Sequence, residues 1–433
     1  MNVHDSEKIC GILHDSGYQK AEDMKSADVI VLNTCSVREK PEQKIYSELG
    51  RIKKIKAQNP HLIVAVCGCV AQQEKEELFK KSPVPDLIIG PKNIHQLPEL
   101  IEKSKRRIEK HSDHRQRFTA ISHARLLPVF ELHYIERPSP FKAYITIMEG
   151  CNKFCSFCVV PFTRGRELCR PFNNIIREAS QLAQTGYKEI CLLGQNVNSY
   201  VYDNYAFPDL LDAVGKIPSL QRIRFVTSYP NNFDDRLIEV MKSNNRICHS
   251  LHLPVQSGSN NVLNRMRRGY TREDYLGTIN AIKKAIPSLC LSTDIIVGFP
   301  GETDEDFQLT LDLIQQAQFA IMYSFKYSPR PYTNALRYDN DVPEQTKVQR
   351  LATLQELQKA IQINYYKGLI GLEKEVLVDG CSKRNAEEQS GRTTENIIVN
   401  FAAGKNVQGK MVLVKITHAL SNCAKGEFIK ILD

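Results

Sequence analysis

Short apolar runs separated by stretches with helical periodicity fill the first hundred residues of the chain. Residues 29–32 and 63–66 are continuous apolar runs that end in polar or Gly-rich turns, the pattern of parallel strands buried on both faces. A helix is predicted to begin at Asp5 or Ser6, whose side chains can accept hydrogen bonds from first-turn amides. Residues 1–102 are therefore predicted to form a small α/β domain.

A second, longer alternation of strands and helices begins near residue 143. Its apolar runs are residues 143–148, 189–194, 223–227, 249–255, 289–299 and 320–328. Six strand–helix units in succession favour a partial parallel β/α barrel over two dinucleotide-binding halves. Since a long polar helix over residues 344–366 closes this region, residues 137–367 are predicted to form one domain.

The pattern changes again after this helix. Short apolar runs at residues 375–378, 396–399, 411–414 and 428–431 are separated by Gly, Asn and Ser turns. This pattern predicts a small all-β barrel over residues 368–433. Between the first two domains, residues 103–136 are basic and rich in turn formers, and we interpret them as a linker.

Composition narrows the class of protein. The 433 residues, 42% hydrophobic and 25% charged, suit a soluble globular chain of two or three domains. No stretch has the length of apolar sequence that spans a membrane, and the polar N-terminal sequence lacks the layout of a signal peptide. We therefore expect a cytoplasmic protein without a membrane partner. Thirteen cysteines in such a protein indicate metal or redox chemistry rather than disulfides.

The net charge of +9 is unevenly placed along the chain. Residues 103–125 hold eight Lys or Arg against two Asp or Glu, which accounts for six of the nine surplus charges. A solvated linker is the usual explanation of an isolated basic run, and a contact strip for nucleic-acid phosphates is the alternative.

The most informative stretch is a CxxxCxxC motif formed by Cys151, Cys155 and Cys158 at the end of the first predicted barrel strand. Thiolates are soft ligands suited to iron–sulfur clusters, and one tight loop lets three sulfurs converge on a single cluster. Three ligands for four irons leave one iron open, at the end of a β/α barrel where substrates bind. A zinc site is the alternative, but structural zinc normally takes four ligands and this loop offers three.

A CxxxCxxC motif on the first strand of a partial barrel resembles the radical S-adenosylmethionine superfamily. The resemblance implies that the open iron binds S-adenosylmethionine and that an electron from this 4Fe-4S cluster cleaves it to a 5′-deoxyadenosyl radical. Further motifs resemble the methylthiotransferases over nearly the whole chain. They are LNTCSVREKPEQK around Cys35, GCVAQQE around Cys69, MEGCNKFCSFCVVPFTRG, LLGQNVNSY, LHLPVQSGS and IVGFPGET.

Residues beside the cysteines narrow the resemblance. SVRE after Cys35 and CVVPFTRG around Cys158 resemble the branch that adds a methylthio group to carbon 2 of N(6)-dimethylallyladenosine, next to the anticodon of tRNA. Branches that act on another tRNA adenosine derivative or on a ribosomal protein aspartate are the alternatives within the enzyme class. A non-catalytic iron–sulfur RNA-binding protein is the alternative of another class. The resemblance also implies that the C-terminal barrel is an RNA-binding TRAM module.

The family carries a second, auxiliary 4Fe-4S cluster, held by three cysteines of the N-terminal domain, which carries the sulfur. Cys35 and Cys69 match two of these cysteines, each directly after an apolar strand. The third ends a strand immediately upstream of the stretch that aligns with residues 1–7, so we expect the true chain to extend upstream through that strand. We expect Cys67 and Cys10 to be poor substitutes, because Cys67 lies inside the apolar strand and Cys10 lies within the first helix.

Polar residues after the barrel strands are candidates for binding S-adenosylmethionine. Gln195 and Asn196 follow the second strand, and Gln256 and Ser257 follow the fourth. Loop capping explains these four residues equally well. Asp294, on the fifth strand, would be costly if buried without a partner, which favours a polar site.

Several arginines allow two interpretations. Arg164 and Arg166, just after the triad, suit either the anions of tRNA or cofactor, or a salt bridge within the barrel. Arg265, Arg267 and Arg268 suit a solvated helix face or a second RNA contact. For the reaction as a whole, the resemblance implies tRNA as substrate and a flavodoxin or ferredoxin as electron donor, and we expect a monomer.

Overall fold

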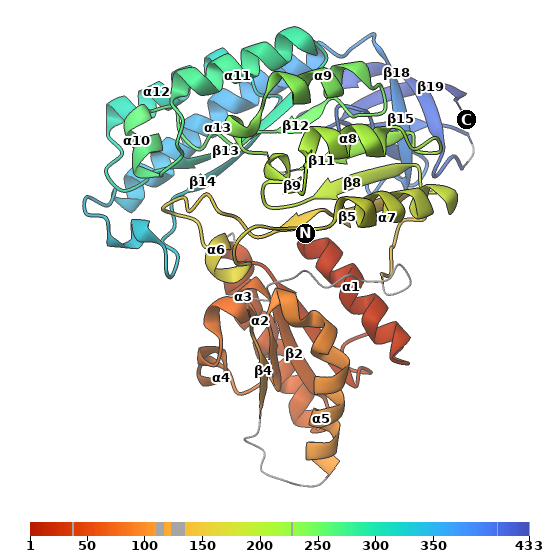
Figure 1. Cartoon of the computed structure of the whole chain (residues 1–433), viewed down its shortest axis with the longest axis vertical. Helices are drawn as coiled ribbons and strands as arrows, with labels where there is room; N and C mark the ends of the chain where they lie inside the picture. Colours follow the sequence, from red (N-terminus) through yellow and green to blue (C-terminus); the bar gives the residue numbers. More distant parts are fainter. Residues whose placement is uncertain (37–38, 110–116, 123–134, 227, 405, 433) are drawn as a thin grey trace. The chain divides into compact units, whose positions relative to one another are not determined.

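The computed structural model describes the chain apart from residues 37–38, 110–116, 123–134, 227, 405 and 433 (Figure 1). The chain forms two compact units. Unit 1 comprises Met1–Pro138, Met148–Arg170 and Ser328–Leu336, and unit 2 comprises Ser139–Ile147, Pro171–Tyr327 and Arg337–Asp433. The stretch with the three CxxxCxxC cysteines therefore belongs to unit 1, whereas the strands of the predicted barrel belong to unit 2.

Unit 1 is built on a parallel sheet with helices on both faces. Its strands, in their order across the sheet, are β1 (Val29–Thr34), β2 (Ile63–Gly68), β3 (Leu87–Ile89) and β4 (Phe118–Ala120). Its helices are α1 (Asn2–Asp15), α2 (Glu39–Gln58), α3 (Cys69–Glu74), α4 (Glu77–Lys81), η1 (Pro91–Gln96) and α5 (Leu97–Glu109).

Alternate residues of β2 face two different hydrophobic cores. Val64 and Val66 pack in the core that contains Leu49 of α2, whereas Ile63 packs in the core that contains Ile9 of α1. All residues of β2 are buried. The interpretation of the apolar runs as strands buried on both faces is thus confirmed.

Two features of unit 1 differ from the sequence-based expectation. Helix α1 begins at Asn2, so Asp5 lies within its first turn, and no side chain caps the helix at Met1. Part of the predicted linker 103–136 is regular structure, because α5 continues to Glu109 and β4 extends the sheet. The short β4 has little intrinsic signal, since its pairing depends on the neighbouring β3.

The other two segments of unit 1 are short. The second contains β6 (Met148–Glu149), α6 (Val160–Thr163) and β7 (Leu168–Cys169), and β6 pairs with β7 in antiparallel fashion. In the third, the Tyr332 hydroxyl donates a hydrogen bond to the carbonyl oxygen of Gln73 at 3.3 Å. This bond joins the third segment to α3.

Unit 2 contains the partial barrel. Its parallel strands are β5 (Lys142–Thr146), β8 (Glu189–Leu193), β11 (Arg222–Phe225), β12 (Ser250–His252), β13 (Cys290–Val297) and β14 (Ile321–Lys326). A parallel bridge between Ile223 and Ile247 joins the first three strands to the last three. Each apolar run predicted in this region overlaps one of these strands, so the partial-barrel prediction is confirmed.

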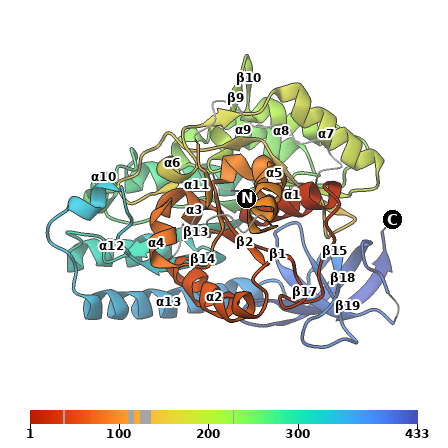
Figure 2. The ribbon, with the colours of Figure 1, turned by 90° about the horizontal axis from the view of Figure 1, so that it is seen from below.

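Helices alternate with the strands of this barrel. They are α7 (Phe172–Gln184), α8 (Phe207–Gly215), α9 (Asp235–Ser243), α10 (Asn260–Arg265), α11 (Arg272–Ala285), α12 (Asp304–Ala317) and α13 (Glu344–Lys367). The smaller elements are η3 (Val197–Ser199), β9 (Val201–Tyr202), β10 (Tyr205–Ala206) and η4 (Pro230–Asn232), and η5 (Asn334–Arg337) spans the change from unit 1 to unit 2. Helix α13 packs along β14 (Figure 2). Among the described residues, no helix has the length and apolar character needed to cross a membrane.

The C-terminal strands form a closed barrel, as predicted. In their order around the barrel they are β15 (Glu373–Cys381), β16 (Gln389–Arg392), β17 (Ile398–Ala402), β19 (Ala424–Ile431) and β18 (Met411–Ala419). Strand β16 was not among the predicted apolar runs, because its sequence QSGR has no apolar side chain. Its Gly391 is needed, since a β-carbon there would lie 2.5 Å from the carbonyl oxygen of Leu377.

Two buried arginines of β11 hold this small barrel to the parallel strands. Arg222 donates hydrogen bonds to the carbonyl oxygens of Arg392 and Glu375, at 2.5 and 2.8 Å. Arg224 donates to the carbonyl oxygens of Thr394 and Thr393, at 3.0 and 2.6 Å. The acceptors are backbone groups in every case.

Candidate functional site

The structure brings Cys35 and Cys69 together at one end of the unit 1 sheet. They directly follow Thr34 and Gly68, which are paired across β1 and β2. Gly68 has a φ of +94°, and a β-carbon there would lie 2.4 Å from the carbonyl oxygen of Thr34. Burial raises the pKa of the Cys69 thiol, and the nearby Cys35 adds to that rise. The two thiols therefore share one site, as the carboxyl ends of neighbouring parallel strands should.

Cys67 does not belong to this pair. It packs in the core with Ile9 and is fully buried, and burial raises its pKa to about 12. Cys10 is a half-buried residue of α1. The Asn2 side chain donates hydrogen bonds to Asn33 Oδ1 at 3.1 Å and to the Thr34 carbonyl oxygen at 3.3 Å. The first residues of the chain thus lie beside the strand end that leads to Cys35.

Cys151, Cys155 and Cys158 lie in the loop between β6 and α6, and all three are half-buried. The Cys158 amide donates to the Cys155 carbonyl oxygen at 3.0 Å, and the Cys151 amide donates to the Gly165 carbonyl oxygen at 3.1 Å. Burial raises the pKa of Cys151 to about 11. Gly150 starts the loop and has a φ of +82°. A β-carbon at this position would lie 2.1 Å from the carbonyl oxygen of Arg166.

Across the described ranges, no three His, Cys, Asp or Glu side chains are arranged to hold a single metal ion. A structural zinc needs four ligands in a tight tetrahedron, so the loop of the triad does not suit that alternative. A cluster of four irons and four sulfides is wider than one ion, and its cysteines stand further apart. Three thiols are one ligand short for structural zinc, whereas a 4Fe-4S cluster with one open iron takes three.

Arg164 is a buried cation between these two groups of cysteines. It forms an ion pair with Asp5 of α1, and its Nη1 lies 3.9 Å from Glu149 Oε2. The positive charge of Arg164 partly offsets the rise that burial causes in the pKa of the Cys69 thiol. Although its burial opposes the charge, Asp5 and Cys69 raise the pKa of Arg164 well above its usual value. The salt-bridge interpretation of Arg164 therefore holds, with a partner in α1 rather than in the barrel.

Arg166 is exposed, and its guanidinium lies 5.2 Å from the centre of the Phe154 ring. Phe154 has a φ of +48° and is itself exposed. Phe162 and Tyr332, also exposed, have ring centres 5.9 Å apart. The second and third segments of unit 1 thus expose aromatic side chains and a cation. In other proteins, this combination binds unpaired RNA bases.

Asn196 is the most distinctive cofactor candidate in unit 2. It follows β8 and is 2% exposed, yet neither its Oδ1 nor its Nδ2 has a hydrogen-bond partner in the described part of the chain. Asn198, two residues later, is fully bonded: it donates to the Tyr229 carbonyl oxygen at 2.8 Å and accepts from the Tyr229 amide at 2.7 Å. Asn198 is thus structural, whereas Asn196 offers a buried amide to a ligand. Gln195 is half-buried.

Gln256 and Ser257 follow β12. Gln256 has a φ of +80° and forms a parallel bridge with Ile295 of β13. The Ser257 hydroxyl lies 3.3 Å from the Thr310 hydroxyl and accepts from the Ser259 amide at 3.2 Å. These bonds support the loop-capping interpretation of Ser257.

Asp294 is half-buried and lies 3.4 Å from His252 Nε2. His252 Nδ1 is 3.0 Å from the Ser292 hydroxyl. Asp294 therefore has the polar partner that its position required. Sequence reasoning missed His252, although a histidine in the middle of the apolar run at β12 was a usable signal.

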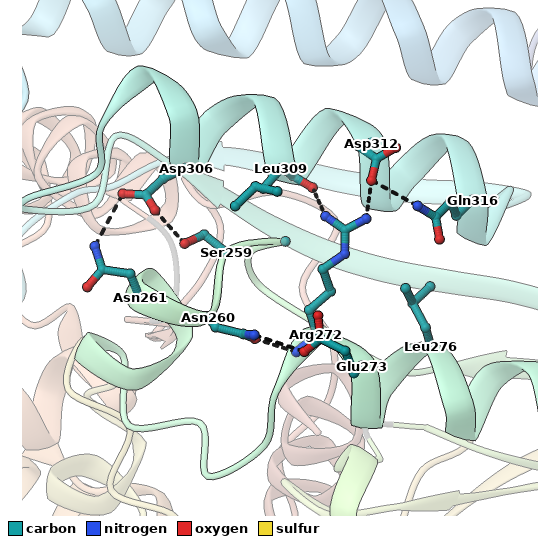
Figure 3. Close-up of a pocket in the computed structure, with 11 residues that line it drawn as sticks. Ser259, Asn260, Asn261, Arg272, Glu273, Leu276, Asp306, Leu309, Asp312 and Gln316 are labelled. Carbon is teal, nitrogen blue, oxygen red and sulfur yellow. Dashed lines mark hydrogen bonds and ion pairs between the residues drawn. The ribbon is translucent and has the colours of Figure 1, made fainter.

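A hollow of about 570 Å³ lies between α10, α11 and α12 of unit 2 (Figure 3). Its polar side chains bond one another. Arg272 donates to the Leu309 carbonyl oxygen at 2.9 Å and pairs with Asp312, and the Ser259 hydroxyl donates to Asp306 at 2.5 Å. Since these lining groups already have partners, we assign no ligand to this hollow.

The described part of the basic run 103–125 is largely paired within unit 1. Arg117 donates to the Phe79 carbonyl oxygen at 3.1 Å. The ion pairs are Lys103–Glu99 at 2.6 Å, Lys105–Glu102 at 2.8 Å and Arg107–Asp86 at 3.0 Å. The rest of the run, at 110–116 and 123–125, lies outside the described residues.

Of the three arginines after β12, two are bonded to backbone carbonyl oxygens of unit 2 and one is exposed. Arg265 donates to the Pro300 carbonyl oxygen at 3.0 Å, and the buried Arg268 donates to the Pro254 carbonyl oxygen at 2.9 Å. Arg267 is exposed. Only Arg267 of the three thus retains the exposure that a contact with RNA needs.

Comparison with known proteins identifies two families along the chain. Residues 145–314 match the Radical SAM superfamily, and residues 1–90 match the family described as Uncharacterized protein family UPF0004. Curated relatives match nearly end to end. The tRNA-2-methylthio-N(6)-dimethylallyladenosine synthase of Carboxydothermus hydrogenoformans is 44% identical over 96% of this chain and 94% of its own. The enzymes of that name from Idiomarina loihiensis and Bordetella pertussis are 42% and 43% identical, over 99% and 98% of this chain and 89% and 95% of theirs.

Solved structures show the same fold. The radical S-adenosylmethionine methyltransferase TsrM from Kitasatospora setae, with cobalamin and a 4Fe-4S cluster bound, has a TM-score of 0.55 at 15% identity. That match covers 88% of this chain and 78% of TsrM. The cobalamin-dependent S-adenosylmethionine radical enzyme OxsB has a TM-score of 0.52 at 13% identity, over 82% of this chain and 53% of OxsB.

Proposed function

The chain belongs to the family of tRNA-2-methylthio-N(6)-dimethylallyladenosine synthases, and we propose that it adds a methylthio group to carbon 2 of N(6)-dimethylallyladenosine next to the anticodon of tRNA. It is a tRNA methylthiotransferase that acts by radical S-adenosylmethionine chemistry. The observation that carries the proposal is the 42–44% identity over almost the whole chain. A non-catalytic protein that shared only one domain with these enzymes would not match them over almost its whole length.

The enzyme uses 4Fe-4S clusters and S-adenosylmethionine. We propose that Cys151, Cys155 and Cys158 hold the radical cluster, and that Cys35 and Cys69 contribute to the auxiliary cluster. The half-buried thiols of one loop and the paired ends of β1 and β2 support this assignment. When bound, the radical cluster supplies the electron that cleaves S-adenosylmethionine.

In this proposal, the protein's own side chains bind and orient S-adenosylmethionine. Asn196 presents both an amide donor and a carbonyl acceptor without partners among the described residues, which suits the polar groups of S-adenosylmethionine. Asp294, with His252 beside it, adds a polar pair on the barrel strands. Gln195, Gln256 and Ser257 remain predicted cofactor contacts, with Ser257 the weakest because its hydroxyl is already bonded.

The partners follow from this chemistry. The substrate is tRNA. We propose that a flavodoxin or ferredoxin delivers the electron, that the enzyme acts as a monomer, and that it works in the cytoplasm. The closed C-terminal barrel supports an RNA-binding TRAM-like role for that part of the chain.

Nucleoside analysis tests the proposed function. In a strain that lacks the gene, mass spectrometry of digested tRNA should show N(6)-dimethylallyladenosine in place of its 2-methylthio form. A plasmid copy should restore the modification, whereas the Cys155→Ala variant should not. An unchanged methylthio level in the deletion strain, or loss of methylthio-aspartate from a ribosomal protein, would reject the proposal.

A further inference from the structure

Tyr332 combines a strained backbone with an exposed aromatic side chain, in the third segment of unit 1. Its φ is +66°, in the left-handed region that a bulky residue rarely adopts. The residue is 56% exposed, so burial of its ring does not offset this strain. Strained residues persist where the surrounding structure fixes them, and they cluster at ligand sites. Tyr332 is therefore a candidate for a contact with a ligand.

Two neighbouring elements of unit 1 hold the segment of Tyr332 in place. The Tyr332 hydroxyl donates a hydrogen bond to the carbonyl oxygen of Gln73 in α3, at 3.3 Å. Three residues further on, the Ala335 amide donates to the carbonyl oxygen of Ser156 at 2.8 Å. Ser156 lies inside the CxxxCxxC loop. The exposed ring is therefore anchored at its hydroxyl, and its segment is attached directly to the loop of the triad.

Phe162 extends the exposed aromatic surface. Its ring centre is 5.9 Å from that of Tyr332, with 35° between the ring planes. Phe162 is 41% exposed and belongs to α6, which begins two residues after Cys158. The guanidinium of Arg166 lies on the same segment of unit 1, 5.2 Å from the centre of the Phe154 ring. Aromatic rings with a nearby cation bind single-stranded nucleic acid, because bases stack on the rings and phosphates are attracted to the cation.

We propose that Phe162 and Tyr332 form a stacking platform for an unpaired base of the tRNA loop, next to the nucleotide that receives the methylthio group. The inference rests on the proposed function, in which that nucleotide lies beside the anticodon, in a loop whose neighbouring bases are also unpaired. The hydrogen bond from Ala335 to Ser156 attaches the platform to the loop proposed to hold the radical cluster, where the reacting nucleotide has to arrive. Since every base has a π face, the platform positions the tRNA without reading its sequence.

Equilibrium binding of an anticodon stem–loop RNA to the full, cluster-loaded chain tests the proposal. Phe162→Ala and Tyr332→Gly should each raise the dissociation constant about tenfold. Glycine is the choice at position 332 because it adopts a positive φ without strain, so this variant removes the ring and keeps the backbone. Tyr332→Phe keeps the ring and should retain most of the affinity. The dependence of affinity on salt concentration should not change in these variants, since none of them removes a charge.

Tyr205→Ala is the matched control. Tyr205 is an exposed tyrosine of unit 2, 45% exposed, whose ring stacks on Phe172 with their centres 4.0 Å apart. This variant should leave the dissociation constant unchanged. With dithionite as reductant and no RNA, all variants should release as much 5′-deoxyadenosine as the unaltered enzyme, because the platform contacts the RNA rather than the cofactor.

Unchanged affinity in Phe162→Ala and Tyr332→Gly would overturn the proposal, and so would an equal loss of affinity in Tyr205→Ala. Loss of 5′-deoxyadenosine release without RNA would overturn it by assigning the two rings to the support of the triad loop. Normal RNA affinity with slower reduction by flavodoxin would overturn it in favour of a protein partner. The loss of affinity should be the same when adenosine replaces N(6)-dimethylallyladenosine in the stem–loop, so this result is separate from the nucleoside analysis that tests the proposed function.

Discussion

The carbonyl oxygen of Thr34 occupies the place that a β-carbon on Gly68 would take, since the two atoms would be 2.4 Å apart. The ends of β1 and β2 can approach this closely only with glycine at position 68. Cys35 and Cys69 come directly after these two residues, so the close approach sets the separation of their backbones.

We therefore expect Gly68→Ala to move the two strand ends apart and to lower the iron bound by a protein that lacks the triad. Its φ of +94° and ψ of −158° form a conformation that is essentially restricted to glycine, so alanine there also adds roughly 1–3 kcal/mol of backbone strain. Gly17→Ala is the matched control, because Gly17 has a φ of +88° with no atom within 4 Å of the added carbon. Iron content and thermal unfolding are the measurements. Equal iron content in the two variants would contradict the expectation.

Cys69→Ala and Cys155→Ala should separate the two halves of the reaction. Cys155→Ala should abolish the release of 5′-deoxyadenosine by the reduced enzyme, because it removes a ligand of the radical cluster. Cys69→Ala should still release 5′-deoxyadenosine but add no methylthio group to tRNA. Chromatography of the nucleoside and mass analysis of the tRNA measure the two outcomes in one reaction mixture. Loss of 5′-deoxyadenosine in both variants would argue against two separate sites.

Asn196→Ala should weaken the binding of S-adenosylmethionine about tenfold, equivalent to about 1.4 kcal/mol, without lowering the unfolding temperature. Its amide has no partner in the described protein to lose, and removing an unpaired buried group costs little. Asn198→Ala should do the reverse, since it breaks two hydrogen bonds to Tyr229 and should cost roughly 1–3 kcal/mol. Equilibrium dialysis with labelled ligand and calorimetry make the comparison. A loss of stability in Asn196→Ala would mark that residue as structural.

The buried Glu189 makes the stability of the fold depend on pH. Burial is the largest single effect and raises the pKa of its carboxyl, but Arg224, whose Nε is 3.1 Å away, acts together with Lys142 and Arg222 to make the net shift downward. A lowered pKa in the folded state stabilises the fold above the ordinary value of about 4.5, and this stability is lost as pH falls further.

Arg224→Met should invert this behaviour. The Glu189 carboxylate is then buried without its main partner, so the variant should lose about 3 kcal/mol near neutral pH and recover as pH falls towards 4.5. The double variant Glu189→Gln with Arg224→Met removes the buried charge, so its stability should no longer recover as pH falls, although it still lacks the Arg224 bonds to residues 393 and 394. Unfolding temperatures measured across this pH range test the prediction. A variant that stays equally unstable at every pH would contradict it.

The sequence predicted the framework of the fold and most of the chemistry. Continuous apolar runs identified the parallel strands of both units, since strands buried on two faces have no polar side to interrupt the run. The spacing of Cys151, Cys155 and Cys158 predicted their shared loop, because ligands that close in sequence cannot lie far apart. The residues from Lys142 to Thr146 and from Ile321 to Lys326 were likewise found as strands.

Other features depend on partners that are distant in the chain. Arg164 meets Asp5 across 159 positions, and no local pattern marks that pairing. Strand β16 pairs through its backbone, so its polar sequence gave no signal. The missing partners of Asn196 also appear only when the surrounding fold is known.

Arg222 and Arg224 bind the small C-terminal barrel through its backbone carbonyl oxygens, which every amino acid provides. The side chains of residues 392–394 are therefore not required by this contact. The side chains of that segment can therefore change in evolution while the contact between the barrel and β11 is kept. The same property would let the barrel be exchanged between relatives of different sequence without loss of this contact.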